Sequence, residues 1–186
     1  VEDDFDGTQK IARQAAEESG RTYIHPYDDP AVIAGQGTVA KEIVEELGDY
    51  LATVVIPVGG GGLIAGMAAW LKENRPDVRI VGVEAAGAAS MHASLRAGHP
   101  VSLETIDAFV DGTAVSKIGD HTFEIIRDLV DQVIVVPEGA VSREMLDLYH
   151  VDGIIAEPAG ALSSAAVAMV ARGELPEVEL RGTTAA

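Results

Sequence analysis

Apolar positions along the chain follow two patterns, short uninterrupted runs and helical spacing. The clearest unit begins with a wholly apolar run at residues 53–58, continues through four glycines, and enters an apolar helical pattern at residues 63–73. A second apolar run, VRIVGVE, ends at Glu84. Strands that are apolar on both faces lie inside parallel sheets that helices cover on both sides. The pattern therefore predicts an α/β fold with an open, mostly parallel sheet and helices on both faces.

The alternation of helical and strand patterns continues on both sides of this unit. Further helices are expected at residues 8–20, 39–47, 91–97, 122–130, 141–149 and 158–171, and further strands at residues 22–25 and 133–136. Pro26 and the turn-rich YDDP segment place a boundary near Pro30. With 186 residues, 47% of them hydrophobic, the chain fits one compact unit better than two.

Composition and charge narrow the classes of function. No apolar run approaches the roughly 18 residues that span a bilayer, so we expect no membrane partner. The net charge of -17 would repel a phosphate backbone, which disfavours nucleic acid. Cysteine is absent, which excludes disulfides and thiolate metal sites. The first six residues hold four acids and no signal region, so we expect a cytoplasmic protein.

Four consecutive glycines carry the strongest chemical signal. Gly59, Gly60, Gly61 and Gly62 lie between a buried strand and a helix start, where unpaired N–H groups and the helix dipole favour an anion. Glycine lets the backbone approach phosphate oxygens closely and tolerates positive φ angles. A tight β-α turn without a ligand is the alternative. The glycine run favours a phosphate site over such a turn because four glycines cost a mere turn considerable entropy.

The kind of phosphate is less clear from the loop alone. The dinucleotide pattern fails because Ile64 and Ala65 stand where its last glycine belongs, and the nucleoside-triphosphate pattern fails because Leu63 follows Gly62. Glu84 closes the next strand, however, about where a ribose-binding acid lies in a nucleotide-binding unit. A nucleotide-binding module therefore remains an alternative interpretation of this loop.

Several longer strings narrow the choice. The loop string VVIPVGGGGLIAG resembles the phosphate-binding loop of the tryptophan-synthase-β-like pyridoxal-phosphate enzymes. The strings AVIAGQGTVAKEI, VGVEAAGAASM, FVDGTAVSKIGDHTF and GIIAEPAGA follow the family pattern in the same order and span essentially the whole chain. Together they resemble biosynthetic threonine dehydratase most closely. The resemblance implies pyridoxal 5'-phosphate as cofactor and dehydration and deamination of L-threonine to 2-oxobutanoate and ammonia, with L-serine to pyruvate as a second reaction.

The resemblance also implies which residues meet the cofactor. Its phosphate would be held by the backbone of Gly59, Gly60, Gly61, Gly62 and Leu63. Gly112, beside Asp111, would wall the pocket, although an Asp-Gly pair more often shapes a turn. Glu157 matches an acid near the pocket, and an equally open alternative is a charge that complements the dipole of the following helix.

Other residues that the family chemistry needs are missing. The lysine that holds the cofactor as a Schiff base lies in a motif that this chain lacks, so we nominate no catalytic residue. Glu84 matches a cation-binding acid of some relatives, but Ser90 replaces its second acid, so no metal is expected. None of the five histidines has ligand spacing, so each is expected to be structural or solvent-facing.

The resemblance sets the expected organisation. Residues 1–30 would be the tail of a small domain and the crossover, and residues 31–186 part of the large cofactor domain, with both ends cut and any regulatory domain further on. A homo-oligomer acting on a small amino acid is implied. Serine racemase or serine dehydratase, and a noncatalytic nucleotide- or phosphate-binding module, are the alternatives.

Overall fold

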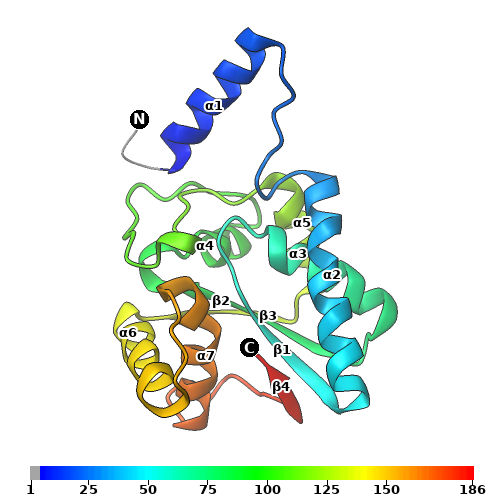
Figure 1. Cartoon of the computed structure of the whole chain (residues 1–186), viewed down its shortest axis with the longest axis vertical. Coiled ribbons are helices and arrows are strands. Elements are labelled where there is room, and N and C mark those ends of the chain that lie inside the picture. The colour runs from blue at the N-terminus through cyan, green and yellow to red at the C-terminus, as the bar shows by residue number, and fades with distance from the viewer. Residues whose placement is uncertain (1–4) are drawn as a thin grey trace.

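A computed structural model describes the backbone of residues 5–186 and the side chains from residue 7 onward, so the acids at positions 2–4 lie outside the described residues. Within this range four parallel strands form one sheet in the order β3-β2-β1-β4 (Figure 1). The strands are β1 (Leu51–Pro57), β2 (Arg79–Ala85), β3 (Gln132–Val136) and β4 (Thr183–Ala185). The expected α/β fold with a parallel sheet is confirmed.

Helices follow most strands, as the alternating pattern predicts. They are α1 (Phe5–Ser19), α2 (Pro30–Leu47), α3 (Gly62–Asn74), α4 (Ser90–Ala97), α5 (Asp120–Leu129), α6 (Glu138–Asp147) and α7 (Pro158–Ala171). Shorter helical turns are η1 (Gly48–Tyr50), η2 (Ala86–Ala88), η3 (Asp111–Thr113) and η4 (Leu148–Asp152). Within the described residues, no helix is long and apolar enough to span a membrane.

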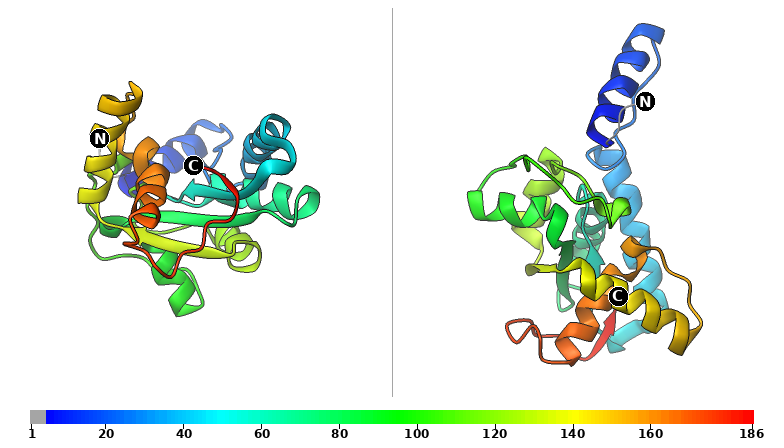
Figure 2. Two further views of the ribbon diagram at one scale, coloured as in Figure 1. Left: turned by 90° about the horizontal axis from the view of Figure 1, so that it is seen from below. Right: turned by 90° about the vertical axis from the view of Figure 1, so that its left-hand side faces the viewer.

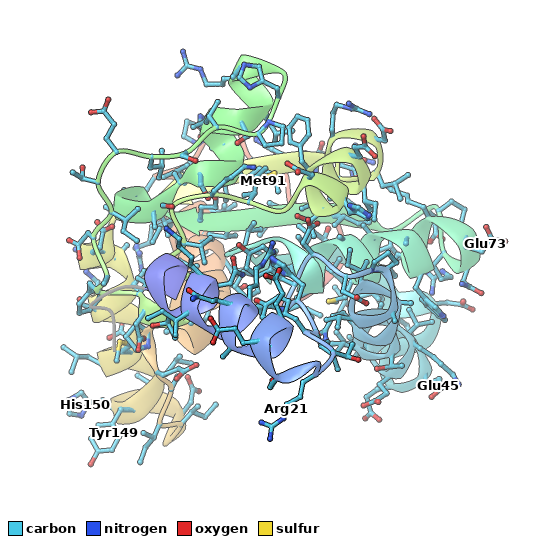
Figure 3. All side chains as sticks on the ribbon, turned by 90° about the horizontal axis from the view of Figure 1, so that it is seen from above. Arg21, Glu45, Glu73, Met91, Tyr149 and His150 are labelled. Atoms are coloured by element: carbon cyan, nitrogen blue, oxygen red, sulfur yellow. The ribbon has the colours of Figure 1, made fainter. Side chains whose placement is uncertain are left out.

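The two faces of the sheet bury separate apolar cores. Val54 and Ile56 of β1 join a cluster with α2, α3 and α5, whereas Val55 joins a cluster with α6 and α7. Figure 2 shows the helices on both sides of the sheet. In Figure 3, Met91 lies in the interior while Glu45 and Glu73 project outward. Successive residues of a strand point to opposite faces, which explains why β1 is apolar throughout.

Helix α2 begins nine residues before the expected start at position 39. Asp29 precedes it as N-cap, with Oδ1 accepting from the N–H of Ala31 at 2.8 Å, and Pro30 occupies the first turn. Gly37 lies where an added β-carbon would meet the carbonyl oxygen of Gly66 at 3.1 Å. Gly37 therefore permits close packing of α2 on α3.

Two strand expectations need correction. Residues 22–25 form no strand, because this segment has no strand beside it, and Ile24 is 67% exposed. Strand β4 was not expected. It pairs with β1 near Leu51, and the buried Thr53 hydroxyl donates to the carbonyl oxygen of Arg181 at 2.9 Å. Whether each of these two segments forms a strand depends on pairing with a neighbouring strand rather than on its local apolar pattern.

Helix α1 stands apart from the sheet and is joined to α2 by an extended segment (Figure 1). The boundary expected near Pro30 coincides with the start of α2. The assignment of residues 1–30 and 31–186 to two domains of a larger protein stays a prediction.

Candidate functional site

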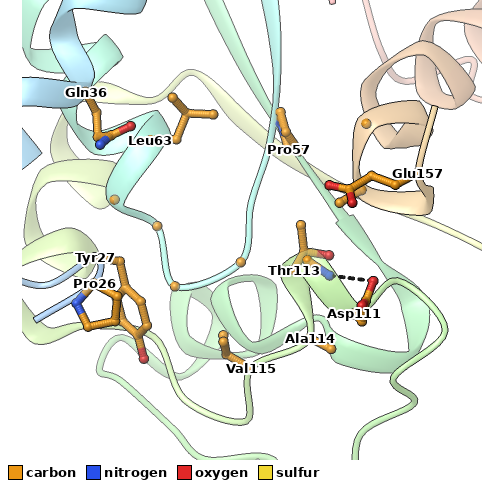
Figure 4. Close-up of a pocket in the computed structure, with 17 residues that line it drawn as sticks. Pro26, Tyr27, Gln36, Pro57, Leu63, Asp111, Thr113, Ala114, Val115 and Glu157 are labelled. Atoms are coloured by element: carbon orange, nitrogen blue, oxygen red, sulfur yellow. Dashed lines mark hydrogen bonds between the residues drawn. The ribbon is translucent and has the colours of Figure 1, made fainter. Parts of the chain in front are cut away.

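One cavity of about 510 Å³ opens beside the glycine loop that follows β1 (Figure 4). Its walls come from the segment before α2, the glycine loop, residues 111–115 and the N-terminus of α7. All seven site residues expected from the sequence line it: Gly59, Gly60, Gly61, Gly62, Leu63, Gly112 and Glu157. The fold thus gathers segments about 50 and 100 residues apart in sequence. Their role as cofactor ligands stays a prediction.

The glycine loop offers free backbone donors to this cavity. Gly61 is the N-cap of α3 with φ at 92°, a left-handed conformation that favours glycine. Within the described residues, no hydrogen bond uses the N–H groups of Gly59, Gly60, Gly61, Gly62 or Leu63. Unpaired N–H groups at a helix N-terminus, together with the helix dipole, attract an anion. The loop is therefore suited to bind a phosphate.

The glycines are also required by packing within the protein. A β-carbon on Gly59 would lie 3.0 Å from Cα of Thr113, and one on Gly60 would overlap the ring of Tyr27. At Gly61 it would meet Oγ1 of Thr122 at 2.9 Å. The sequence suggests only that glycine frees space for a ligand. The structure adds that three neighbouring segments press against the loop.

Tyr27 and Thr122 are functional candidates that sequence reasoning missed. Tyr27 lines the cavity, and the Thr122 hydroxyl donates to the carbonyl oxygen of Gly60 at 2.8 Å. Thr122 lies in the string FVDGTAVSKIGDHTF and Tyr27 lies outside the quoted strings, but nothing in the sequence indicates that either residue contacts the glycines. They follow from the packing of α5 and the segment before α2 around the loop.

Gly112 forms part of the wall opposite the glycine loop. A β-carbon there would lie 2.7 Å from Cβ of Ala159 and 3.6 Å from Oε1 of Glu157. Oδ1 of Asp111 accepts from the Gly112 N–H at 3.0 Å, so Asp111 shapes the turn that the sequence also suggested. The backbone of Gly112 can therefore lie close to α7 while it borders the cavity.

Glu157 is the N-cap residue of α7, and its exposed side chain makes no capping hydrogen bond. It lines the cavity. Its charge still lies at the positive end of the α7 dipole, so both functions suggested by the sequence are compatible with this position.

Glu84 does not serve as a ligand in this cavity. Its carboxylate is fully buried, and Oε1 and Oε2 accept from the N–H groups of Met91 and His92, each at 2.7 Å. Burial raises the pKa of Glu84 to about 7 against the opposing effect of these two hydrogen bonds. Glu84 therefore caps the first turn of α4. It is not available to bind a ribose, so the nucleotide-binding alternative loses the residue that supported it.

Lysines and metal-ligand clusters are absent from the cavity wall. None of the four lysines lines it, and Lys41, Lys72 and Lys117 instead pair with nearby acids. Among the described residues, no group of three or more His, Cys, Asp or Glu is arranged to hold a metal ion. His25 has a structural position, with Nδ1 accepting from the Asp28 N–H at 2.9 Å. Binding of an anion here depends on backbone donors rather than on basic side chains.

Comparison with known proteins identifies the family. The model of the family described as "Pyridoxal-phosphate dependent enzyme" matches residues 1–179. The chain belongs to the pyridoxal-phosphate dependent enzyme family. Pyridoxal phosphate is the cofactor of this family, and its phosphate group matches the free donors of the glycine loop. The four glycines line the cavity without side chains of their own, so they leave room for a phosphate beside the backbone.

The similar proteins include a threonine dehydratase, a threonine deaminase and a serine racemase. The chain is 48% identical over 165 residues to the L-threonine dehydratase biosynthetic IlvA of Bacillus subtilis, covering 89% of this chain and 39% of that protein. Its fold matches the processed form of threonine deaminase isoform 2 from Solanum lycopersicum with a TM-score of 0.88 at 41% identity, covering 97% of this chain and 52% of that one.

Maize serine racemase is also similar, with a TM-score of 0.80 and 36% identity over 85% of this chain and 47% of that structure. The chain spans about two fifths of the length of the curated relatives that it matches.

Proposed function

We propose that the whole protein is a pyridoxal-phosphate-dependent threonine dehydratase, in which this chain supplies the phosphate-binding wall of the active site. The observation that carries the proposal is the row of free N–H groups from Gly59 to Leu63 in a cavity. Identity of 46% and 48% to two biosynthetic threonine dehydratases supports the choice of substrate.

The reaction converts L-threonine to 2-oxobutanoate and ammonia. The β-hydroxyl leaves as water, and a second water molecule then hydrolyses the imine tautomer of the product enamine, which supplies the keto oxygen and releases ammonia. The bound cofactor supplies an electron sink for removal of the α-proton. The contribution of this chain is to bind and orient. The glycine-loop N–H groups hold the phosphate dianion, and the N-terminus of α3 adds its dipole to the attraction.

Other residues of the chain shape the remaining wall. We assign the backbone of Gly112 to the side of the pocket next to the ring, where contact with Ala159 fixes its position. We assign Glu157 to the same wall, where its exposed carboxylate stays within reach of a bound ligand. No lysine of this chain lines the cavity, so the lysine that bonds to the cofactor must come from outside these residues.

A product assay on the whole protein tests the proposal. We expect 2-oxobutanoate from L-threonine, dependent on pyridoxal phosphate, with slower release of pyruvate from L-serine. D-serine formed from L-serine without release of ammonia would instead indicate serine racemase, which the similarity to the maize enzyme keeps as the second candidate. No turnover together with tight nucleotide binding would favour a noncatalytic module.

The proposal extends to the cellular location, oligomeric state and domain organisation of the whole protein. Resemblance to the family supports a cytoplasmic homo-oligomer acting on a small amino acid, with residues 1–30 in a small domain and residues 31–186 in the large one. Light scattering on the purified whole protein tests the oligomeric state, and a monomer at micromolar concentration would contradict it.

A further inference from the structure

The short segment before α2 ties several elements together. This strap consists of His25, Pro26, Tyr27, Asp28 and Asp29. Nδ1 of His25 accepts from the N–H groups of Tyr27 and Asp28, at 3.3 and 2.9 Å, which fixes the turn of the strap. The Asp29 carboxylate caps α2. The strap is therefore held at its own backbone and at the start of α2.

Asp28 fixes the strap to a second helix. Its carboxylate accepts from the N–H groups of Asp120, His121 and Thr122 at 3.0, 2.9 and 3.2 Å, which covers the N-terminus of α5. Because Thr122 also holds the carbonyl of Gly60, the strap and the glycine loop share one anchoring helix. The position of Tyr27 is thus determined on both sides.

Tyr27 lies directly against the glycine loop. A β-carbon on Gly60 would overlap its ring, and one on Gly62 would lie 2.9 Å from its Cβ. The Tyr27 hydroxyl donates to the carbonyl oxygen of Lys117 at 3.1 Å, which fixes the far end of the ring. A planar side chain that is fixed at both ends restricts the backbone freedom that Gly60 would otherwise have.

Tyr27 also lines two cavities. One is the cavity at the glycine loop (Figure 4), and the other is a neighbouring cavity of about 510 Å³ that Lys10, Arg13 and Lys117 border. Tyr27 therefore lies where the two cavities adjoin, next to the loop donors.

We infer that Tyr27 is a positioning residue for the cofactor phosphate: its ring, packed on Gly60, holds the glycine loop in the phosphate-binding conformation. The inference rests on the proposed function of the loop. A ring that merely filled space would affect the stability of the protein, whereas a positioning ring affects the affinity for the phosphate group in particular.

The test measures binding of two cofactor analogues that lack the aldehyde and so cannot bond to a lysine. Pyridoxine 5'-phosphate carries the phosphate and pyridoxine does not. Dissociation constants for both are measured by calorimetry on the whole protein and on the variants Tyr27→Phe, Tyr27→Leu and Tyr27→Ala. Tyr50→Ala is the control, because Tyr50 is 82% exposed and lines neither cavity.

We expect Tyr27→Ala to weaken binding of pyridoxine 5'-phosphate by roughly tenfold, the cost of ordering about one backbone residue of the freed loop, and to leave pyridoxine binding unchanged. Tyr27→Phe keeps the ring and is expected to restore most of the affinity. Tyr27→Leu, which retains apolar volume, is expected to lie between them and gives the answer if the alanine variant does not fold.

Two results overturn the inference alone. The first is unchanged affinity for pyridoxine 5'-phosphate in folded Tyr27→Ala or Tyr27→Leu. The second is equal weakening for both analogues, which would mean general support of the cavity. A wild-type protein that binds neither analogue would overturn the proposed function and the inference with it, so the two failures are distinguishable.

Discussion

The hydroxyl group of Thr122 donates a hydrogen bond of 2.8 Å to the carbonyl oxygen of Gly60, and so links the first turn of α5 to the glycine loop. The same carbonyl oxygen accepts from the N–H of Gly119 at 3.4 Å. Thr122 is fully buried, so no water is available to replace its hydroxyl. The loop carbonyl points to α5 while the loop N–H groups stay free for a ligand.

Replacing Thr122 by valine tests this link. The substitution keeps the shape of the side chain but leaves the carbonyl of Gly60 without its shorter hydrogen bond. Because the carbonyl of Gly60 keeps its longer hydrogen bond from Gly119, we expect the free energy of unfolding to fall by roughly 0.5–1.5 kcal/mol, the net contribution of one hydrogen bond. Urea denaturation measures it. Thr122→Ser keeps the hydroxyl and should lose less, whereas a Thr122→Val variant as stable as the wild type would show that the hydrogen bond does not matter.

A glycine series separates backbone strain from crowding at the loop. Gly61 and Gly98 both have positive φ, but only at Gly61 does an added β-carbon meet a neighbour, at 2.9 Å from Thr122. We expect Gly98→Ala to cost about 1 kcal/mol from strain alone and Gly61→Ala to cost more. Gly61→Ala should also weaken cofactor binding, measured by fluorescence titration of the whole protein.

Gly139→Ala is the matched control for this series, because the position lies within α6 with open space around it. We expect it to leave stability unchanged or to raise it slightly. If Gly61→Ala and Gly98→Ala destabilise equally and bind cofactor equally well, the crowding at Gly61 has no consequence.

Glu84 makes the stability of the protein depend on pH. Its pKa is raised to about 7 in the folded chain from 4.5, so between these values the folded state binds more protons than the unfolded state. Its contribution is fully present below pH 4.5 and is lost as the pH rises to 7 and above. The predicted loss is on the order of 3 kcal/mol, from the size of the pKa difference.

Glu84→Gln removes this titration. At low pH the protonated acid of Glu84 still has two oxygens facing the N–H groups of Met91 and His92, whereas the amide has one oxygen and an NH2 group that cannot accept. We therefore expect a less stable protein at low pH, whose stability changes less between pH 4.5 and 7. Glu42→Gln, at an exposed position, should keep the wild-type slope. Parallel slopes for wild type and Glu84→Gln in chemical denaturation would contradict the assignment of the titration to Glu84.

Elements with a strong local pattern could be predicted from the sequence. Strand β1 is recognisable because burial on both faces makes its residues apolar without interruption, and the start of α7 is recognisable because Pro158 favours the first turn of a helix. The early start of α2 could not be predicted because Gly37 interrupts the apolar helical pattern, although contact with α3 is what requires a small residue at this position. Strand β4 depends on pairing with Leu51, far away in the sequence.

The same distinction applies to the site. The glycine loop and Gly112 stand out as strings, so the sequence located both walls of the cavity. Tyr27 and Thr122 reach the loop from segments 33 and 62 residues from Gly60, and only the folded arrangement brings them there. The buried capping position of Glu84 likewise depends on where α4 begins.

The most direct test of the account is a visible absorption titration of the whole protein with pyridoxal phosphate, followed by addition of L-threonine. We predict a saturable cofactor band that changes when threonine is added, while 2-oxobutanoate accumulates. A spectrum with no saturable band at high cofactor concentration would contradict the claim that the free N–H groups of the glycine loop bind the phosphate of this cofactor.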